Sequence, residues 1–98
     1  MSVKVSNYTK DGSSSPTVTM RVVETPNYKL FYSYAVPIIA LRKADRQVYV
    51  TVKKYSPTTS KHMNTYMYEN FYTWPAERIE RVDQYVIDAL KPEGLELA

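Results

Sequence analysis

The spacing of apolar residues changes after Lys54, and this change constrains the fold of the chain more strongly than its composition does. Before Lys54, apolar residues recur at every second position in short runs, as they do in half-buried strands. After Lys54, Met63, Tyr66 and Met67 recur at intervals of three or four residues, as they do on one face of a helix. This order predicts an α+β domain in which the strands come first and the helices second.

The first half of the chain contains the runs that we expect to form strands. Their predicted bounds are 3–8, 17–24, 28–34, 36–41 and 48–52. Turn-forming residues separate these runs, above all in 10–16, which we expect to be a mobile loop, and in the charged segment 42–47. The two runs that flank 42–47 should pair as an antiparallel hairpin. The run 36–41 is apolar on both faces, so it should be covered on both sides, with Pro37 at its start or at a bulge.

Two helices are expected in the second half of the chain. The first opens with Ser56 as its N-cap and Pro57 at the first helical position, with Thr58 as the alternative cap. The second follows Thr73-Trp74-Pro75 and stops at 91–94. Its apolar stripe at helical spacing consists of Ile79, Val82, Val86 and Ala89 or Leu90. The complete prediction is an antiparallel sheet of four to five strands followed by two C-terminal helices packed on one face.

Length and composition restrict the class of protein. The 98 residues, 44% of them hydrophobic, make a single domain, 1–98, whose tail 92–98 docks or frays. Because the chain has no cysteine, it has no disulfide and no thiolate zinc site. The first residues lack the apolar segment of a signal peptide, and no run approaches the ~18 apolar residues of a membrane span, so no membrane partner is expected. The net charge of +3 favours anionic partners only weakly.

Polar residues are concentrated at the predicted start of the first helix. The stretch 55–62 reads Tyr-Ser-Pro-Thr-Thr-Ser-Lys-His and directly follows two lysines. Capping accounts for Ser56 and Pro57, but not for the hydroxyl residues after them, which are poor helix formers. The binding residues predicted from this pattern are Lys53, Lys54, Tyr55, Ser56, Thr58, Thr59, Ser60, Lys61 and His62.

The chemistry of this helix start suits an anion better than a reaction. Hydroxyls and free backbone N–H groups can hold a phosphate or a carboxylate, with Lys61 adding charge and His62 a donor that switches with pH. The helical neighbours of His62 include no carboxylate to orient it for catalysis, and both glycines lie outside nucleophile elbows and phosphate loops. No acidic cluster completes a metal site around it. We therefore predict no catalytic residue, no metal and no cofactor.

Tyrosine is the unusual component of the chain, with ten tyrosines against two phenylalanines. Most of them suit the half-buried edges of a sheet, where the ring is covered and the hydroxyl reaches water. Tyr68, Tyr72 and Trp74 could stack on bases, but we favour the interpretation that they close the junction between the helices. Five further basic residues are solvated charges unless they share a face with Lys61: Arg42, Lys43, Arg46, Arg78 and Arg81.

Two segments carry a resemblance to a known group of proteins. They are Ser33-Tyr34-Ala35-Val36-Pro37-Ile38-Ile39-Ala40 and Tyr55-Ser56-Pro57-Thr58-Thr59-Ser60-Lys61-His62. Together they resemble small bacteriophage proteins with a domain of unknown function, in which a Ser-Tyr…Ile-Ala strand and a short hairpin precede Tyr-Ser-x-Thr-Thr-Ser-Lys/Arg-His. This chain departs from the pattern by the insertion of Ile39. The resemblance spans 32–71 and implies a virus-encoded accessory protein that acts in the host cytoplasm, without implying an activity.

Three hypotheses for the function follow. The leading one is a non-enzymatic accessory protein whose helix start, 56–62, binds an anionic surface, above all nucleic acid. The alternative is a protein that binds and inhibits a host enzyme or defence complex, since many tyrosines and a weak net charge suit such an interface. An enzyme that acts on phosphate esters through His62 ranks third. The sequence does not decide between a monomer and a homodimer.

Overall fold

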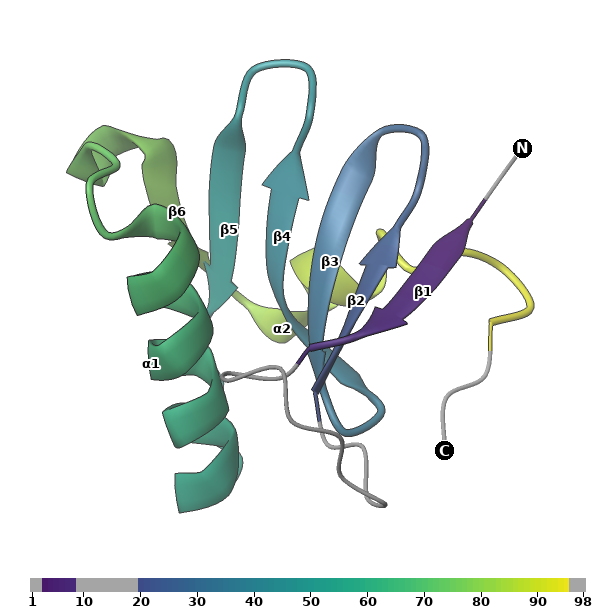
Figure 1. The fold of residues 1–98 in the computed structure, drawn as a ribbon, viewed down its shortest axis with the longest axis horizontal. Helices are drawn as coiled ribbons and strands as arrows, with labels where there is room; N and C mark the ends of the chain where they lie inside the picture. The colour runs from purple at the N-terminus through teal and green to yellow at the C-terminus, as the bar shows by residue number, and fades with distance from the viewer. Residues whose placement is uncertain (1–2, 9–19, 96–98) are drawn as a thin grey trace.

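A computed structural model of the chain describes residues 3–8 and 20–95. These residues form a six-stranded sheet, in the order β1-β2-β3-β4-β5-β6, with one helix in front of it and one behind (Figure 1). The elements are β1 (Lys4–Asn7), β2 (Met20–Glu24), β3 (Tyr28–Ser33), β4 (Val36–Arg42), β5 (Gln47–Thr51), α1 (Pro57–Phe71), the 3₁₀ helix η1 (Ala76–Arg78), β6 (Ile79–Val82) and α2 (Gln84–Asp88). Neighbouring strands are antiparallel except β5 and β6, which are parallel. The chain is α+β as predicted, but its sheet is mixed.

Strand β4 contains a bulge that places two consecutive isoleucines on the same side of the sheet. Phe31 of β3 pairs with Ile39. The next residue of β3, Tyr32, pairs with Pro37, so Ile38 is left as an extra residue of β4. Both isoleucines consequently pack in the same core cluster. Pro37 lies beside this bulge, as predicted.

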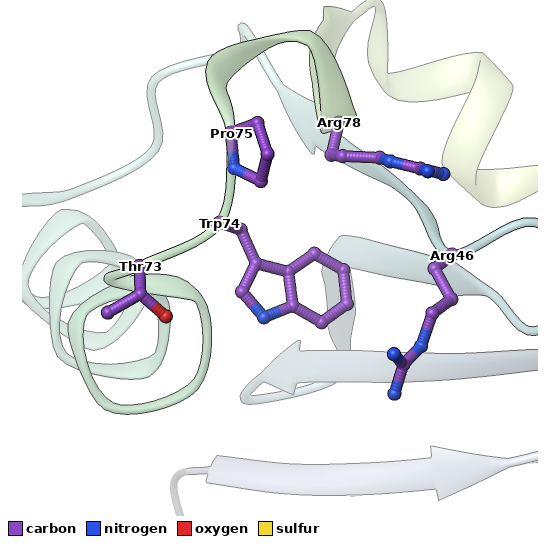
Figure 2. Close-up of a pocket in the computed structure, with 5 residues that line it drawn as sticks. All are labelled: Arg46, Thr73, Trp74, Pro75 and Arg78. Carbon is purple, nitrogen blue, oxygen red and sulfur yellow. The ribbon is translucent and has the colours of Figure 1, made fainter.

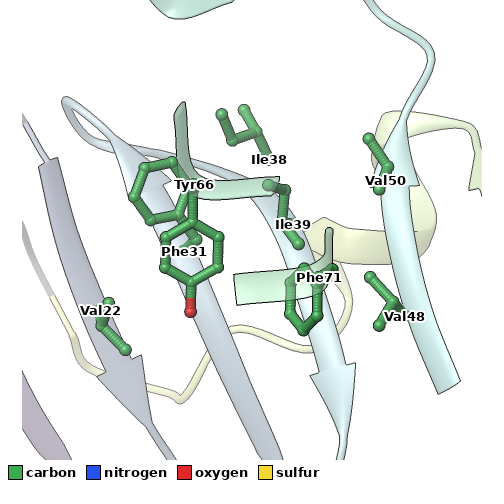
Figure 3. Packing of buried hydrophobic residues seen from close by; sticks show 8 residues of the cluster. All are labelled: Val22, Phe31, Ile38, Ile39, Val48, Val50, Tyr66 and Phe71. Carbon is green, nitrogen blue, oxygen red and sulfur yellow. The ribbon is translucent and has the colours of Figure 1, made fainter. Parts of the chain in front are cut away.

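The first core lies between the sheet and α1 (Figure 3). Its buried residues are Val22, Phe31, Ile38, Ile39, Val48, Val50, Tyr66 and Phe71. Within it, the rings of Phe31 and Tyr66 stack with centroids 4.1 Å apart and planes 21° apart. Complete burial of a side chain such as Phe31 contributes about 1.5–3 kcal/mol. These contacts hold α1, and with it the predicted binding residues, against the sheet.

The second core lies on the opposite face of the sheet, next to α2. Its buried residues are Val23, Leu30, Tyr32, Ala40 and Ile87. Gln84 of α2 also donates a hydrogen bond from Nε2 to the carbonyl oxygen of Pro37 at 2.7 Å. The two helices therefore cover opposite faces, and the prediction that both pack on one face is wrong. The physical reason is that the central strands are apolar on both sides, so a single covered face would leave the other exposed.

Three shorter elements, η1, β6 and α2, replace the predicted second helix. Ile79 and Val82 are three positions apart, which places them on opposite faces of a strand, and they pack in the first and the second core respectively. In a helix the same spacing would place both on one side. We attribute the strand to the edge of β5, whose backbone groups need partners and obtain them from β6. The sheet consequently has six strands, more than the predicted four to five.

Two predicted flexible segments lie wholly or partly outside the described residues. The loop 10–16 is outside them altogether. Of the tail 92–98, Leu95 packs against the second core, and 96–98 are outside the described part. Across residues 3–8 and 20–95, no helix has both the length and the apolar character to cross a bilayer.

Candidate functional site

The first helix begins where the sequence predicts, at Pro57, and Ser56 caps it. Ser56 Oγ accepts a hydrogen bond from the Thr59 N–H at 3.1 Å. The carbonyl oxygen of Ser56 accepts a second bond, from the Ser60 N–H at 3.0 Å. Pro57 occupies the first helical position, where no N–H is required. Capping by Ser56 is thereby confirmed, and it leaves few backbone N–H groups of the first turn free for a ligand.

A network of hydroxyl groups ties this helix start to the sheet. Ser33, the last residue of β3, donates from Oγ to Thr59 Oγ1 at 3.1 Å, and the same oxygen lies 2.9 Å from His62 Nδ1. The Ser56 hydroxyl lies 3.3 Å from the same threonine oxygen. Ser33 and Thr59 are both buried, and a buried hydroxyl is stable only when it is hydrogen-bonded. The network therefore fixes the first two turns of α1 against the end of β3.

Tyr34, in the turn between β3 and β4, adds an aromatic contact to this network. Its ring centroid lies 5.7 Å from that of His62. Its φ of +57° is in the left-handed region, which costs a residue with a side chain of order 1–3 kcal/mol. Ser33-Tyr34 and the stretch 55–62 belong to the two motifs singled out in the sequence, and here they are in contact. Ser33 and Tyr34 are absent from the predicted site, although the joint occurrence of the two motifs is a signal that could have found them.

His62 is a neutral group at neutral pH. Burial lowers its pKa below the ordinary value of 6.5, and the positive charge of Lys61 lowers it further. The imidazole therefore adds no positive charge with which to attract an anion. When Ser33 donates its one proton to Thr59, His62 Nδ1 must carry the hydrogen of its bond to Ser33, which leaves Nε2 with a lone pair. We assign His62 to positioning α1.

The Ser33–His62 pair lacks the access that a nucleophilic serine needs. Ser33 is 1% exposed, so a substrate has no approach to its Oγ. Within residues 3–8 and 20–95, no group of three or more histidine or acidic side chains is placed to hold a metal ion. The geometry of this pair supports a structural hydrogen bond between helix and sheet.

The open part of the helix start is a shallow hollow of about 260 Å³. It is lined by Lys54, Tyr55, Ser56, Pro57 and Ser60. Lys53 extends over the Tyr55 ring, with Nζ 5.0 Å from the ring centroid. Burial raises the pKa of the Tyr55 hydroxyl, and the negative charge of Asp88 raises it further, so this hydroxyl is a neutral donor. The hollow thus offers an ammonium group, part of an aromatic ring and the hydroxyls of Tyr55 and Ser60, while the third hydroxyl, of Ser56, donates to Thr59 Oγ1.

The predicted binding residues fall into two groups. Thr59 is buried and His62 half-buried, and both face the hydroxyl network. The others are exposed, except for half-buried Ser60: Lys53, Lys54, Tyr55, Ser56, Thr58 and Lys61. Three of these lie outside the lining of the hollow, namely Thr58 and Lys61 in the first turns of α1 and Lys53 before the helix.

A second group of polar side chains lies at the opposite end of α1. Arg46, from the turn between β4 and β5, and Arg78 of η1 lie beside Trp74 (Figure 2). Trp74 packs edge-on against Phe71, with ring centroids 4.8 Å apart, and so closes the end of α1. The two arginines, expected to be separate solvated charges, are brought together around this indole.

Tyr68 of α1 and Tyr72, the residue that caps its C-terminal end, are exposed. They are 66% and 73% exposed, and their ring centroids are 4.9 Å apart. A hollow of about 380 Å³ beside them is lined by Asn64, Thr65, Tyr68 and Glu69. The interpretation that these two tyrosines close a junction between helices is therefore wrong, because the second helix expected to cover them does not form there.

Comparison with known proteins yields a family without an assigned activity. The family model that matches is described as a family of unknown function, DUF8033, and it covers residues 3–82. This span contains the whole sheet, α1 and both of its ends, and it stops before α2. No curated protein and no solved structure gives a significant match.

Proposed function

This chain belongs to DUF8033, a family of unknown function, and we propose that it binds an anionic macromolecule, above all nucleic acid, through the start of α1. One observation carries the proposal: the polar groups at this helix start fall into a set that attaches α1 to the sheet and a set that remains exposed. Thr59 and His62 hold α1 to the sheet, while basic and hydroxyl groups that play no part in that attachment remain exposed. The resemblance to small phage proteins supports a role in the cytoplasm of an infected host.

The exposed groups match the needs of a phosphate backbone. Lys54 and Lys61 are exposed, and neither forms an ion pair with the carboxylates that the structure describes. The hydroxyls of Thr58 and Ser60 can donate to phosphate oxygens. Because capping already uses the first-turn N–H groups of Thr59 and Ser60, side chains must make most of the contacts.

The expected binding is moderate in strength and sensitive to salt. Each phosphate that a lysine neutralises changes the slope of log K against log salt by about −0.9 for B-DNA and −0.7 for single strands. The net charge of +3 gives only a weak long-range attraction. The nearby carboxylate of Asp88, which acts on the Tyr55 hydroxyl, reduces the local positive potential further.

Replacing Lys54 and Lys61 together with alanine is expected to weaken nucleic-acid binding about tenfold at low salt and to reduce the salt slope by roughly 1–2. The loss follows from the removal of two exposed cations at the start of α1, neither of which is paired with a described carboxylate. Fluorescence anisotropy with labelled single- and double-stranded DNA and RNA, at about 50 and 200 mM salt, measures both quantities.

The matched control is Lys4→Ala/Lys91→Ala, which removes the same charge from exposed positions far from the start of α1 in the sequence. This variant should retain most of the wild-type affinity. An equal loss in both variants would reduce the effect to net charge alone. The absence of salt-sensitive binding by the wild type would end the proposal.

Two exposed tyrosines in and directly after α1 favour a second candidate function, the binding and inhibition of a host enzyme or defence complex. Tyr68 and Tyr72 are close together, well exposed and next to a hollow. Tyrosine is enriched among the residues that dominate the energy of protein interfaces. A hydroxyl-bearing ring can remain in water until a partner covers it.

A pull-down from nuclease-treated bacterial lysate tests this second candidate. We expect a stoichiometric partner to bind the wild type, to be lost with Tyr68→Ser/Tyr72→Ser, and to be retained with Tyr85→Ser. Tyr85 is the suitable control because it is 71% exposed and lies on α2. A partner that binds all three proteins equally, or no partner at all, would contradict this interface.

A further inference from the structure

A hollow of about 300 Å³ lies at the end of α1 remote from the stretch 55–62 (Figure 2). It is lined by Arg46, Thr73, Trp74, Pro75 and Arg78. Since α1 has 15 residues and an α-helix rises about 1.5 Å per residue, roughly 22 Å separate this hollow from the helix start. The two hollows share no lining residue, so each has to be understood from its own side chains.

The arginines of this hollow have no carboxylate partner among the described residues. Asp45, the acid next to Arg46 in the sequence, is held by Arg42 through bonds of 2.9 Å and 2.6 Å, and Glu77, next to Arg78, forms no ion pair with it. Arg42 holds the pKa of Asp45 at about 2, so this carboxylate stays ionised and paired. Within the described part of the chain, Arg78 donates a hydrogen bond only from Nη1, to the main-chain carbonyl oxygen of Asp45, and its other N–H groups have no acceptor there.

The backbone conformation at Arg46 gives no reason for an arginine at this position. Its φ of +60° lies in the left-handed region, where glycine is the favoured residue. Its N–H closes the turn by donating to the carbonyl oxygen of Arg42 at 2.8 Å, a bond that any residue except proline can make. Its side chain lies over the Trp74 ring, with Cζ 5.6 Å from the ring centroid. The conformation places a guanidinium beside an indole at the expense of an unfavourable φ.

We propose that this hollow binds one nucleotide of a single-stranded nucleic acid, with the phosphate at Arg46 and Arg78 and the base against the indole of Trp74. Guanidinium groups present paired donors that match phosphate oxygens. Aromatic side chains stack on bases with little regard for sequence. In a duplex, each base is already paired and stacked, so this site selects unpaired strands. The inference stands apart from the start of α1, because binding here requires neither Lys54 nor Lys61.

Trp74 is the only tryptophan of the chain, so intrinsic tryptophan fluorescence reports on this hollow alone. The experiment titrates the full chain with a short oligothymidylate strand, with a duplex of the same length, and with inorganic phosphate at equal ionic strength. We expect saturable quenching by the single strand, with an affinity about tenfold or more above that for the duplex. Absence of quenching, or equal affinity for strand and duplex, would overturn the proposal.

Three variants locate the effect. Arg46→Gly should fold, because glycine accepts the left-handed backbone, and it should lower the affinity about tenfold; Arg78→Ala should do the same. Arg81→Ala removes the same charge from an exposed position of β6 outside the hollow and should leave the affinity nearly unchanged. An equal loss with Arg81→Ala would overturn the site. Retained quenching in Lys54→Ala/Lys61→Ala would show that the two binding surfaces are independent, whereas its loss there would contradict a separate site.

Discussion

Replacing Ile87 with alanine is expected to lower the free energy of unfolding by about 2–5 kcal/mol. Ile87 is fully buried in the second core, and its removal leaves a cavity between α2 and the back of the sheet. Chemical denaturation followed by circular dichroism measures the change. Because domains of this size have a total stability of about 5–15 kcal/mol, the variant should unfold at clearly lower denaturant concentration.

The substitution Val86→Ala is a control that distinguishes the short α2 from a continuous second helix. A continuous second helix, as predicted from the apolar stripe, would bury Val86 and leave Ile87 outside the stripe. In the structure Val86 is only half-buried, so Val86→Ala should cost less than about 1 kcal/mol. A larger loss for Val86→Ala than for Ile87→Ala would favour the helical stripe and contradict the short α2.

Replacing Ser33 with alanine is expected to cost about 1–3 kcal/mol, because Thr59 Oγ1 and His62 Nδ1 each lose a hydrogen-bonding partner in a buried place. Denaturation gives the size of the loss. His62 is the only histidine, so its imidazole signals in NMR spectra report directly whether the ring has lost its contact.

The matched substitution is Ser6→Ala on the exposed strand β1, which should change stability by less than about 0.5 kcal/mol. If Ser33→Ala costs no more than Ser6→Ala and leaves the imidazole signals unchanged, then Ser33 does not anchor α1. In that case Thr59 and His62 would return to the group of residues available to a ligand.

Local patterns predict those parts of the fold that depend on neighbouring residues. Alternating residues indicate the strands of the hairpins, and Ser56-Pro57 marks the start of α1 because capping involves only the next few residues. The double burial of β4 is also visible in its sequence, since both of its faces are apolar. These features need no knowledge of what packs against them.

The prediction for the second half of the chain is wrong where one spacing of apolar residues fits two structures. Ile79 and Val82 fit a helix by their spacing and a strand by their β-branched side chains, and only the unpaired edge of β5 decides between the two. The hydroxyl network could not be predicted from local sequence patterns either. Ser33 lies 26 residues from Thr59 and 29 from His62 in the chain, so their contact depends on the complete fold.

The parallel pairing of β5 with β6 gives the chain an order of assembly. Strands β2 to β5 join through short turns, so their ladders close with a small loss of chain entropy. The ladder between β5 and β6 encloses the whole of α1, so its closure costs more chain entropy and we expect it to form after the hairpins. Arg78 and Trp74 belong to this late-closing connection, whereas Arg46 belongs to the early one. The nucleotide site proposed between them therefore requires this long-range ladder to be closed, and cannot form from the β4–β5 hairpin alone.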